Sequence, residues 1–316
     1  MNILSRIIAP RIIAAAAPAL ALGQPAHAES GWGLLNMTQG VTAISRDIYD
    51  LHMMMLWVCV AIGVVVFGVM IYSIATFRHS RGAVPDTTMV HNTKVEIVWT
   101  VIPVCILIAV AIPAVRTLIQ IEDLRNTQLT IKVTGFQWGW NYDYLASGVN
   151  FFSRLDRASD AARQLDSGID PNTVPHYLLN VDHPLVVPVD TKVRLLITAD
   201  DVIHSWWVPQ FGVKKDAIPG FVNEAWFKVD ADKPGIYRGQ CAELCGRDHG
   251  FMPIVVEALP KKDFDAWLKA QQASQKAHAA GPATAAASPA ETGLPSAAGR
   301  SAAASAATAA PATTTG

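Results

Sequence analysis

Two long stretches of the sequence contain no charged residue and are rich in apolar side chains. The first runs from Met53 to Phe77 and the second from Ile97 to Val115. As α-helices they measure about 37 Å and about 28 Å at roughly 1.5 Å per residue, against a hydrocarbon core of roughly 30 Å. Pro103 and Pro113 in the second stretch are tolerated in a membrane helix when neighbouring groups satisfy the freed backbone groups. The pattern predicts two membrane-spanning helices.

Residues 1–28 have the features of a secretory signal sequence. Arg6 and Arg11 give a positively charged start, an apolar run follows from Ile12 to Leu22, and Ala26-His27-Ala28 forms a small-residue cleavage site. The apolar run is too short to span a membrane, which requires roughly 20 residues. We therefore expect residues 1–28 to be a signal peptide and the following residues to be exported.

The short segment between the two apolar stretches is biased toward basic residues, and such loops stay on the cytoplasmic side. Its basic residues are Arg78, His79, Arg81 and Lys94, against the acidic Asp86 and Glu96. This bias and the signal sequence agree on a transmembrane hairpin over residues 29–126. We expect a two-pass protein of the bacterial inner membrane with both termini in the periplasm.

From about residue 127 the pattern changes to the alternation of apolar and polar positions that is typical of half-buried strands. Short runs of this kind, several rich in β-branched residues, occur at Leu129–Val133, Leu185–Val189, Val193–Thr198, Glu224–Val229, Ile236–Gln240 and Pro253–Glu257. Turn residues such as Lys233-Pro234-Gly235 separate them. This spacing predicts an all-β sandwich or barrel over residues 127–276.

Three segments depart from the strand pattern. Ala146–Pro175 is polar and predicts an inserted loop, with a short helix near Ser159–Leu165. Residues 277–316 are nearly all Ala, Pro, Ser, Thr and Gly, which bury too little apolar surface to offset ordering entropy, so we expect a disordered tail. Lys261–Lys276 predicts a terminal helix whose apolar face holds Phe264, Trp267 and Leu268.

Composition narrows the class of protein. Only 16% of the residues are charged and the formal net charge is −1, so nothing indicates nucleic-acid binding. Cys59 and Cys105 lie within the apolar stretches and are expected to be buried small hydrophobic residues. Cys241 and Cys245, the remaining cysteines, are the pair with polar neighbours.

The stretch from Cys241 to Met252 brings two thiols, an imidazole and a thioether together in a short segment. Its donors are Cys241, Cys245, His249 and Met252, and a second histidine, His204, lies upstream. Soft sulfur and imidazole ligands suit copper or zinc, whereas magnesium and calcium prefer oxygen. A bound cation also offsets the charge of two neighbouring thiolates. The donors therefore predict a metal site, with copper preferred.

Four interpretations of these donors remain open from the residues alone. A disulfide between Cys241 and Cys245 suits an oxidising compartment but requires neither His249 nor Met252. A structural zinc site of two cysteines and two histidines leaves Met252 unused. A blue-copper site needs one cysteine and leaves a thiol over. Two metals bridged by two thiolates use all the donors, which makes this the preferred interpretation.

Several stretches resemble subunit II of respiratory cytochrome c oxidases of the mitochondrial and alphaproteobacterial kind. They follow the family's order over about half the chain, and the last is highly specific: Val95–Pro103, Gln137–Tyr144, Asp201–Trp206, Lys215–Gly220 and Gly239–Pro253. The resemblance implies a cupredoxin-type β-barrel that carries CuA, a centre of two copper ions, behind a two-helix membrane hairpin.

The resemblance also assigns the ligands by position. Two bridging thiolates, two imidazoles, a weak thioether and a backbone carbonyl would come from Cys241, Cys245, His204, His249, Met252 and Glu243. The Glu243 side chain would bind a magnesium or manganese ion shared with subunit I, since carboxylate is a suitable hard ligand.

Two residues outside this set receive roles from the resemblance. Trp138 matches the exposed tryptophan that receives electrons from cytochrome c, and alternation would place Trp138 and Trp140 on one strand face, with Trp140 as packing. Gly139 departs from the family, which usually has an aromatic residue there. Glu96 matches the mouth of a proton pathway into subunit I, although an acid at a helix N-terminus also has an electrostatic reason to be there.

The resemblance implies an oxidoreductase subunit that passes electrons from cytochrome c to haem in subunit I, for oxygen reduction coupled to proton pumping. Its partners would be subunit I, the other oxidase subunits, cytochrome c and the lipid bilayer. Cytochrome c is basic, so an acidic docking face is expected, with Asp143, Asp182 and Asp201 as candidates.

Two other classes of protein fit the sequence less well. A quinol-oxidase-type subunit II is a structural partner without copper and should lack the cysteines that this chain keeps. The CuA domain of a nitrous oxide reductase belongs to a soluble enzyme, and the two predicted spans and the lack of a histidine-rich second metal domain speak against it.

Overall fold

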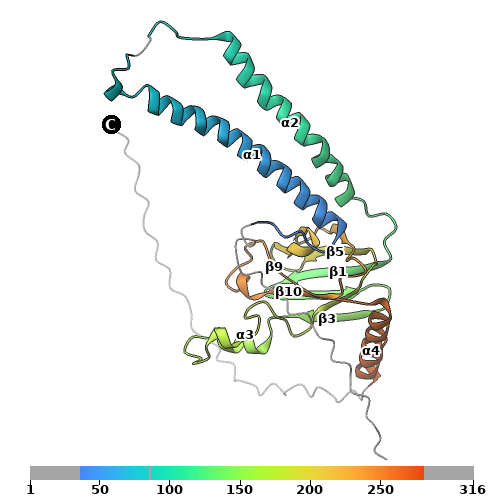
Figure 1. Ribbon diagram of the computed structural model, residues 1–316. Coiled ribbons are helices and arrows are strands. Elements are labelled where there is room, and N and C mark those ends of the chain that lie inside the picture. The colour runs from blue at the N-terminus through green and yellow to red at the C-terminus, as the bar shows by residue number, and fades with distance from the viewer. Residues whose placement is uncertain (1–35, 85–86, 281–316) are drawn as a thin grey trace, which may run out of the picture.

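The computed structural model describes residues 36–84 and 87–280, and shows a two-helix hairpin that stands on a layered β-domain (Figure 1). This arrangement confirms the predicted fold class of a membrane hairpin followed by an all-β domain. The signal peptide predicted for residues 1–28 lies outside the described residues, and so does the predicted tail beyond residue 280.

The hairpin consists of α1 (Ala43–Thr76) and α2 (Thr93–Ile121), joined by a connection with the short 3-10 helix η2 (His79–Arg81). A polar side chain caps the start of each helix. Thr42 accepts a hydrogen bond from the Ser45 N–H, and Asn92 accepts one from the Val95 N–H. Both helices are long and apolar enough to cross a membrane, so the chain is a two-pass membrane protein.

The expected burial of Cys59 and Cys105 is wrong for the chain taken alone, because both thiols are exposed. A pair of helices buries only the narrow strip where they touch, and the remaining apolar surface faces outward. That surface is available to lipid or to other membrane subunits.

The β-domain is a sandwich of two five-stranded sheets. The first has the order β3-β2-β1-β5-β8, with bounds Val149–Ser153, Gly139–Tyr144, Leu129–Phe136, Val193–Ala199 and Asn223–Phe227. The second has the order β4-β10-β9-β6-β7, with bounds Leu185–Pro188, Pro253–Leu259, Gly235–Cys241, His204–Val208 and Val213–Ala217. The pairs β1–β5 and β4–β10 are parallel, and the other pairs are antiparallel.

The core lies between the two sheets and follows the alternation seen in the sequence. In β5, Val193, Leu195 and Ile197 are fully buried while the residues between them are partly exposed. Trp140 from the first sheet and Trp206 from the second are also fully buried. These large side chains fill the layer beside the residues of the predicted metal site.

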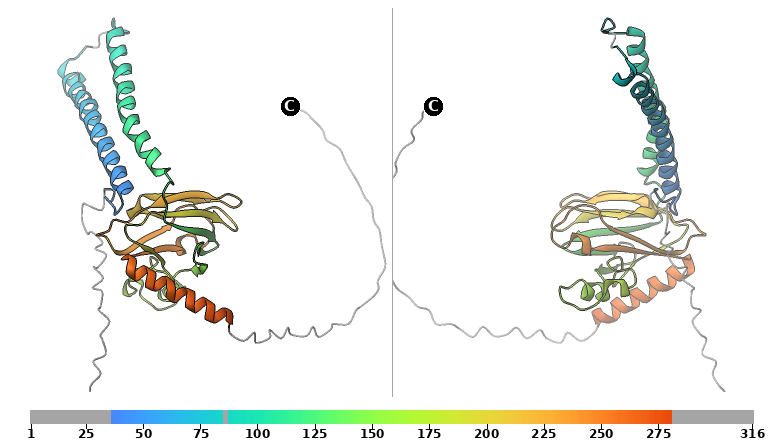
Figure 2. Two further views of the ribbon diagram at one scale, coloured as in Figure 1. Left: turned by 90° about the vertical axis from the view of Figure 1, so that its right-hand side faces the viewer. Right: turned by 60° about the vertical axis from the view of Figure 1, so that its left-hand side comes forward.

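The polar segment predicted as a loop is only partly irregular. Its first residues form β3, which pairs with β2, and α3 (Arg157–Ala162) and the 3-10 helix η3 (Pro171–Thr173) follow. The edge strand β7 was also not predicted, because charged residues occupy its exposed positions. The terminal helix α4 spans Lys261–Ala280 and extends past its predicted end. Figure 2 shows α4 on the side of the sandwich away from the hairpin.

Hydrogen bonds fix the hairpin to the sandwich at both of its ends. At the start of α1, the Thr42 hydroxyl donates to the Phe211 carbonyl oxygen at 2.9 Å. In the last turn of α2, the Trp226 indole N–H donates to the Gln120 carbonyl oxygen at 3.2 Å. The hairpin therefore stands in a defined position on the β-domain.

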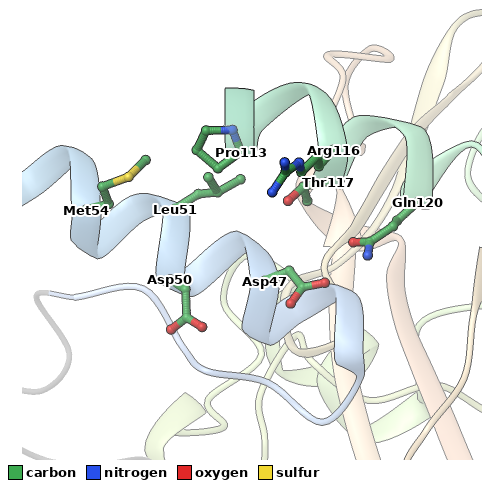
Figure 3. A pocket seen from close by; sticks show the side chains of 8 residues that line it. All are labelled: Asp47, Asp50, Leu51, Met54, Pro113, Arg116, Thr117 and Gln120. Carbon is green, nitrogen blue, oxygen red and sulfur yellow. The ribbon is translucent and has the colours of Figure 1, made fainter. Parts of the chain in front are cut away.

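A cavity of about 300 Å³ lies between the ends of α1 and α2 next to the β-domain (Figure 3). Its lining combines the charged Asp47 and Arg116 with the apolar Leu51 and Pro113. None of the residues predicted to bind metal, electrons or protons lines this cavity.

Tyr144 connects the two sheets, because its buried hydroxyl donates to the Val186 carbonyl oxygen at 2.6 Å and accepts from the Val186 N–H at 3.0 Å. Tyr144→Phe leaves both backbone groups without a partner, so we expect the free energy of unfolding to fall by about 1–3 kcal/mol. Denaturant titration of the full chain in detergent, followed by tryptophan fluorescence, measures this change.

Tyr177→Phe is the matched control for this substitution. Within the described part of the chain its hydroxyl makes no hydrogen bond, so its removal should change stability by no more than about 0.5 kcal/mol. Equal stabilities of Tyr144→Phe and the unaltered chain would contradict the proposed bridging role.

Candidate metal centre

Three elements of the second sheet bring the predicted metal ligands together. His204 is the first residue of β6, Cys241 the last residue of β9, and Met252 directly precedes β10. The antiparallel pairing of β6 with β9 places Trp206 opposite Cys241. Adjacent strands in one sheet therefore carry ligands that are far apart in the sequence to the same end of the sandwich.

Cys245 lies at the centre of the ligand group. Its sulfur is 3.9 Å from the Cys241 sulfur, 3.5 Å from Nδ1 of His249 and 3.4 Å from the Met252 sulfur. His249 opens the 3-10 helix η5 (His249–Phe251), whose turn holds it between Cys245 and Met252. Met252 and both cysteines are buried.

Cys241 contacts the remaining donors. Its sulfur lies 3.3 Å from the Glu243 carbonyl oxygen, and one ring nitrogen of His204 lies within 4.8 Å of both cysteine sulfurs. All six donors predicted from the sequence thus converge on one site.

The geometry does not support a disulfide, because the sulfurs are 3.9 Å apart and both cysteines are free, whereas a disulfide has a bond of about 2.05 Å. A single tetrahedral zinc ion uses four ligands. The site gathers more donors than that, and the Met252 sulfur points directly at Cys245. A pair of soft metal ions fits the donor set better than either alternative.

The orientation of His204 also fits a metal ligand. Its Nε2 lies 2.9 Å from Oδ1 of Asp201, which fixes the ring. Its Nδ1 is buried and has no hydrogen-bond partner among the described residues. Because buried polar atoms are normally paired, this unpaired nitrogen is suited to bind a metal beside Cys241.

Burial and the neighbouring groups shift the pKa values of the two thiols in opposite directions. Burial, reinforced by the neighbouring Cys241, raises the pKa of the Cys245 thiol to about 12. Burial also opposes ionisation of Cys241, but the adjacent His204 and the backbone of Ser205 and Glu243 together outweigh it and lower the pKa of that thiol. Two thiolates at this site therefore require a positive charge between them.

Asp201 supports His204 electrostatically as well as geometrically. Burial opposes the charged form of Asp201, but hydrogen bonds from His204 and from the Val202 N–H lower the pKa of the carboxyl. Burial lowers the pKa of His204, and Cys241 and Asp201 together raise it above its ordinary value.

Small and aromatic residues shape the space around the ligands. A methyl group added at Gly135 would lie 2.9 Å from the His204 ring, so only glycine permits this close approach. Trp140 packs edge-on against His204 with ring centroids 6.0 Å apart. Its indole N–H also donates to the Met252 carbonyl oxygen at 3.3 Å. Trp140 is core packing, as predicted, and it also braces two of the ligands.

Trp138 lies beside the ligand group, but the predicted sharing of one strand face with Trp140 is wrong. Phe136 pairs with Gly139, so Trp138 belongs to the tight turn between β1 and β2. Its partly exposed indole N–H donates to the Cys245 carbonyl oxygen at 3.3 Å. The Arg247 guanidinium lies over the ring at 5.5 Å.

The two predicted carboxylates lie apart from this cluster. The Glu243 side chain is exposed although its carbonyl faces Cys241, and no acidic metal cluster includes it among the described residues. Glu96 is in the first turn of α2, where it accepts a hydrogen bond from the Asn92 N–H at 3.3 Å. Figure 1 shows this end of α2 far from the β-domain.

Sequence reasoning missed the supporting roles of Asp201 and Gly135. Asp201 was considered only as a docking residue, although its position three residues before His204 was a signal for a ligand-orienting carboxylate. No local signal identified Gly135, because its contact with His204 depends on how β1 and β6 pack.

Comparison with known proteins identifies the family of this chain. Residues 129–259 match the family of the periplasmic domain of cytochrome c oxidase subunit II, and residues 30–117 match the family of its transmembrane domain. A probable cytochrome c oxidase subunit 2 of Rickettsia bellii is 41% identical over 225 residues, which cover 71% of this chain and 79% of the relative. Cytochrome c oxidase subunit 2 of Arabidopsis thaliana is 35% identical over 260 residues, 81% of this chain and 95% of the relative.

Among solved structures, the periplasmic domain of subunit II of cytochrome oxidase from Bradyrhizobium japonicum is similar to this chain. It is 40% identical, with 48% of this chain and 98% of that chain covered and a TM-score of 0.40. The two family matches and the long alignments with relatives together cover the hairpin and the β-domain. The chain belongs to the cytochrome c oxidase subunit II family.

Proposed function

We propose that this chain is the electron-accepting subunit of a bacterial cytochrome c oxidase and holds a CuA centre. The observation that carries this proposal is the convergence of two free thiols, 3.9 Å apart, with a buried and unpaired imidazole nitrogen of His204. Electrons would come from cytochrome c and continue to haem in subunit I, where oxygen reduction is coupled to proton pumping.

The ligand roles in this proposal follow the donor types. The thiolates of Cys241 and Cys245 are the bridging ligands, and two imidazoles, a thioether and a backbone carbonyl complete the set from His204, His249, Met252 and Glu243. Copper bound by these residues supplies one-electron redox chemistry. The residues themselves supply a buried, braced frame that excludes water and keeps the donors in place.

Trp138 is the proposed contact for cytochrome c. It is partly exposed, and a hydrogen bond joins its indole to the backbone of Cys245, a ligand residue. This hydrogen bond connects a partly exposed aromatic ring directly to the ligand loop. Of the acidic docking candidates, Asp201 also lies close by, since its carboxylate accepts from the Gln137 N–H.

The two isolated carboxylates are proposed to act with subunit I. Glu243 is exposed next to the ligand loop, so its carboxylate is free to share a magnesium or manganese ion with a second subunit. Glu96 lies at the end of α2 remote from the metal site, where we propose that it opens a proton pathway. Its hydrogen bond to Asn92 already accounts for its place in the helix, so the proton role rests on the resemblance to the family.

The proposed location is the inner membrane of a bacterium. The hairpin turn would be cytoplasmic and the β-domain periplasmic. Residues 1–28 would be the signal peptide, 29–126 the hairpin and 127–276 the CuA domain, with α4 continuing to Ala280 and the predicted tail following it. The exposed apolar surfaces of α1 and α2 suit contact with lipid, subunit I and other oxidase subunits.

Copper loading of the full chain in detergent tests the ligand assignment. We expect two copper ions per chain and an electron paramagnetic resonance spectrum of one unpaired electron shared by both ions. Cys245→Ser should abolish the shared-electron spectrum, whereas Cys59→Ser, the same change in α1, should leave it intact. One copper or zinc ion per chain, bound equally well by Met252→Leu, would refute the proposal.

The role of Trp138 is tested by Trp138→Phe in the assembled oxidase. Loss of the indole hydrogen bond to Cys245 should slow electron transfer from cytochrome c by about tenfold or more, or about 1.4 kcal/mol in the barrier. Copper content should remain unchanged. Trp267→Phe, which removes an indole in α4 on the side of the sandwich away from the hairpin, should not alter this rate. Equal rates for Trp138→Phe and the unaltered oxidase would exclude Trp138 as the contact.

Neutralising the two isolated carboxylates in the assembled oxidase should produce distinct defects. Glu96→Gln should slow oxygen reduction without changing the copper spectrum, and Glu122→Gln at the other end of α2 should have no such effect. Glu243→Gln should reduce manganese binding, measured by the Mn²⁺ resonance of oxidase from manganese-grown cells. Unchanged oxygen reduction in Glu96→Gln would exclude the proton role of Glu96, and unchanged manganese binding in Glu243→Gln would exclude the metal role of Glu243.

A further inference from the structure

The segment between β3 and β4 leaves the sandwich and returns to nearly the same point. Leu155 and Val181 form an isolated antiparallel bridge, and the Asp182 N–H donates to the Arg154 carbonyl oxygen at 3.0 Å. These contacts close the base of the excursion formed by residues 156–180, which we call the insertion. The insertion is therefore a loop whose two ends are joined by backbone hydrogen bonds at the edge of the sheet.

The helix α3 within the insertion is fixed at its start and along one side. The Asp156 carboxylate accepts from the Ala158 and Ser159 N–H groups, both at 3.2 Å. Ser159 is fully buried, and its hydroxyl accepts from the Leu178 N–H at 3.1 Å. Arg163 directly follows α3 as its C-cap residue, so these bonds also fix the backbone from which its side chain extends.

Arg163 reaches from the insertion to the loop that carries the metal ligands. Its guanidinium pairs with Asp160 at 2.8 Å, within its own segment, and with Asp248 at 3.6 Å. It also lies over the Phe251 ring at 4.4 Å. The side chains of Arg163 and Asp248 are only 23% and 14% exposed, so solvent screens this pair less than a fully exposed one.

The two residues of the metal-binding loop that Arg163 contacts each precede a predicted ligand. Asp248 precedes His249, and Phe251 precedes Met252. The Phe251 N–H also donates to the Asp248 carbonyl oxygen at 2.9 Å, which links both contacts into one turn. Asp248 has one other ion-pair partner in the described structure, Arg247, whose side chain is 82% exposed. Arg163 is thus the less exposed of the two cations that hold this turn.

We propose that Arg163 is a positioning residue that fixes the metal-binding loop, residues 246–252, and that the insertion serves to present it there. This inference rests on the proposed function for its metal, but the contacts that carry it are those of the chain alone. Planar guanidinium suits both partners, since it pairs with a carboxylate and stacks on an aromatic ring. Holding the loop keeps His249 and Met252 beside Cys245 and so slows loss of metal.

Release of copper from the loaded full chain to a chelator measures this effect. Arg163→Ala should release copper roughly tenfold faster, at the lower end of the 10–100-fold range for residues that orient ligands. Arg157→Ala is the matched control, because Arg157 is exposed on the same helix and makes no ion pair or hydrogen bond within the described chain. Arg163→Lys should release copper at a rate between those of Arg163→Ala and the unaltered chain, since lysine keeps the charge but cannot stack as a planar group.

Hydrogen exchange provides a readout that general loss of stability would not imitate. In Arg163→Ala, exchange of the backbone amides of residues 246–252 should increase, while exchange in β5 and β9 should match that of the unaltered chain. Asp248→Asn should act similarly, and combining it with Arg163→Ala should add little, because both changes remove the same contact. If Arg163→Ala does not fold, Arg163→Lys and Asp248→Asn decide the question by the same measurements.

Unchanged copper release and unchanged loop exchange in Arg163→Ala would overturn the positioning role, and so would an equal effect of Arg157→Ala. Exchange measured on the metal-free chain separates this inference from the proposed function. If the unaltered chain binds no copper, the proposed function fails, while increased exchange of residues 246–252 in metal-free Arg163→Ala still supports the positioning role.

Discussion

The structure of the metal site depends on the charge of two buried thiols that lie 3.9 Å apart. Desolvation disfavours each thiolate, and the two charges disfavour one another, which is why the pKa of Cys245 is raised. The pKa of Cys241 is lowered because its neighbours, His204 first among them, favour the thiolate. A protein can keep such a pair only if a cation lies between the sulfurs or one sulfur stays protonated. The neighbouring imidazoles, thioether and carbonyl are all donors to soft metal ions, so the residues present favour the first arrangement.

The sandwich meets this requirement by using adjacent strands of one sheet as supports. His204 and Cys241 begin and end neighbouring strands, so sheet hydrogen bonds fix their separation. The first sheet adds Gly135, which leaves room for the His204 ring, and Trp140, which holds the Met252 carbonyl. Asp201 then fixes the other side of the ring. Residues of both sheets therefore determine the positions of the ligands, in addition to the loop that carries the cysteines.

How far the sequence predicts this structure depends on how local each feature is. The donors from Cys241 to Met252 lie within one short segment, so residue type and spacing revealed them, and alternating apolar positions revealed strands such as β5. Position in the sequence could not show that Arg163 contacts Asp248, because no periodic pattern links the insertion to the loop. Trp138 was placed on a strand because alternation alone does not show where a hairpin turns; the pairing of Phe136 with Gly139 decides that.

The contacts between hairpin and sandwich have a consequence for the complete enzyme. Thr42 is bonded to Phe211 where the chain enters α1, and Gln120 is bonded to Trp226 where it leaves α2. Lys192 adds a hydrogen bond to the Arg125 carbonyl oxygen in the connection to β1, at 2.9 Å. Because both crossings are held, the ligand loop has a set position relative to the membrane helices. These bonds therefore connect the position of the ligand loop to that of the two membrane helices through the chain's own contacts.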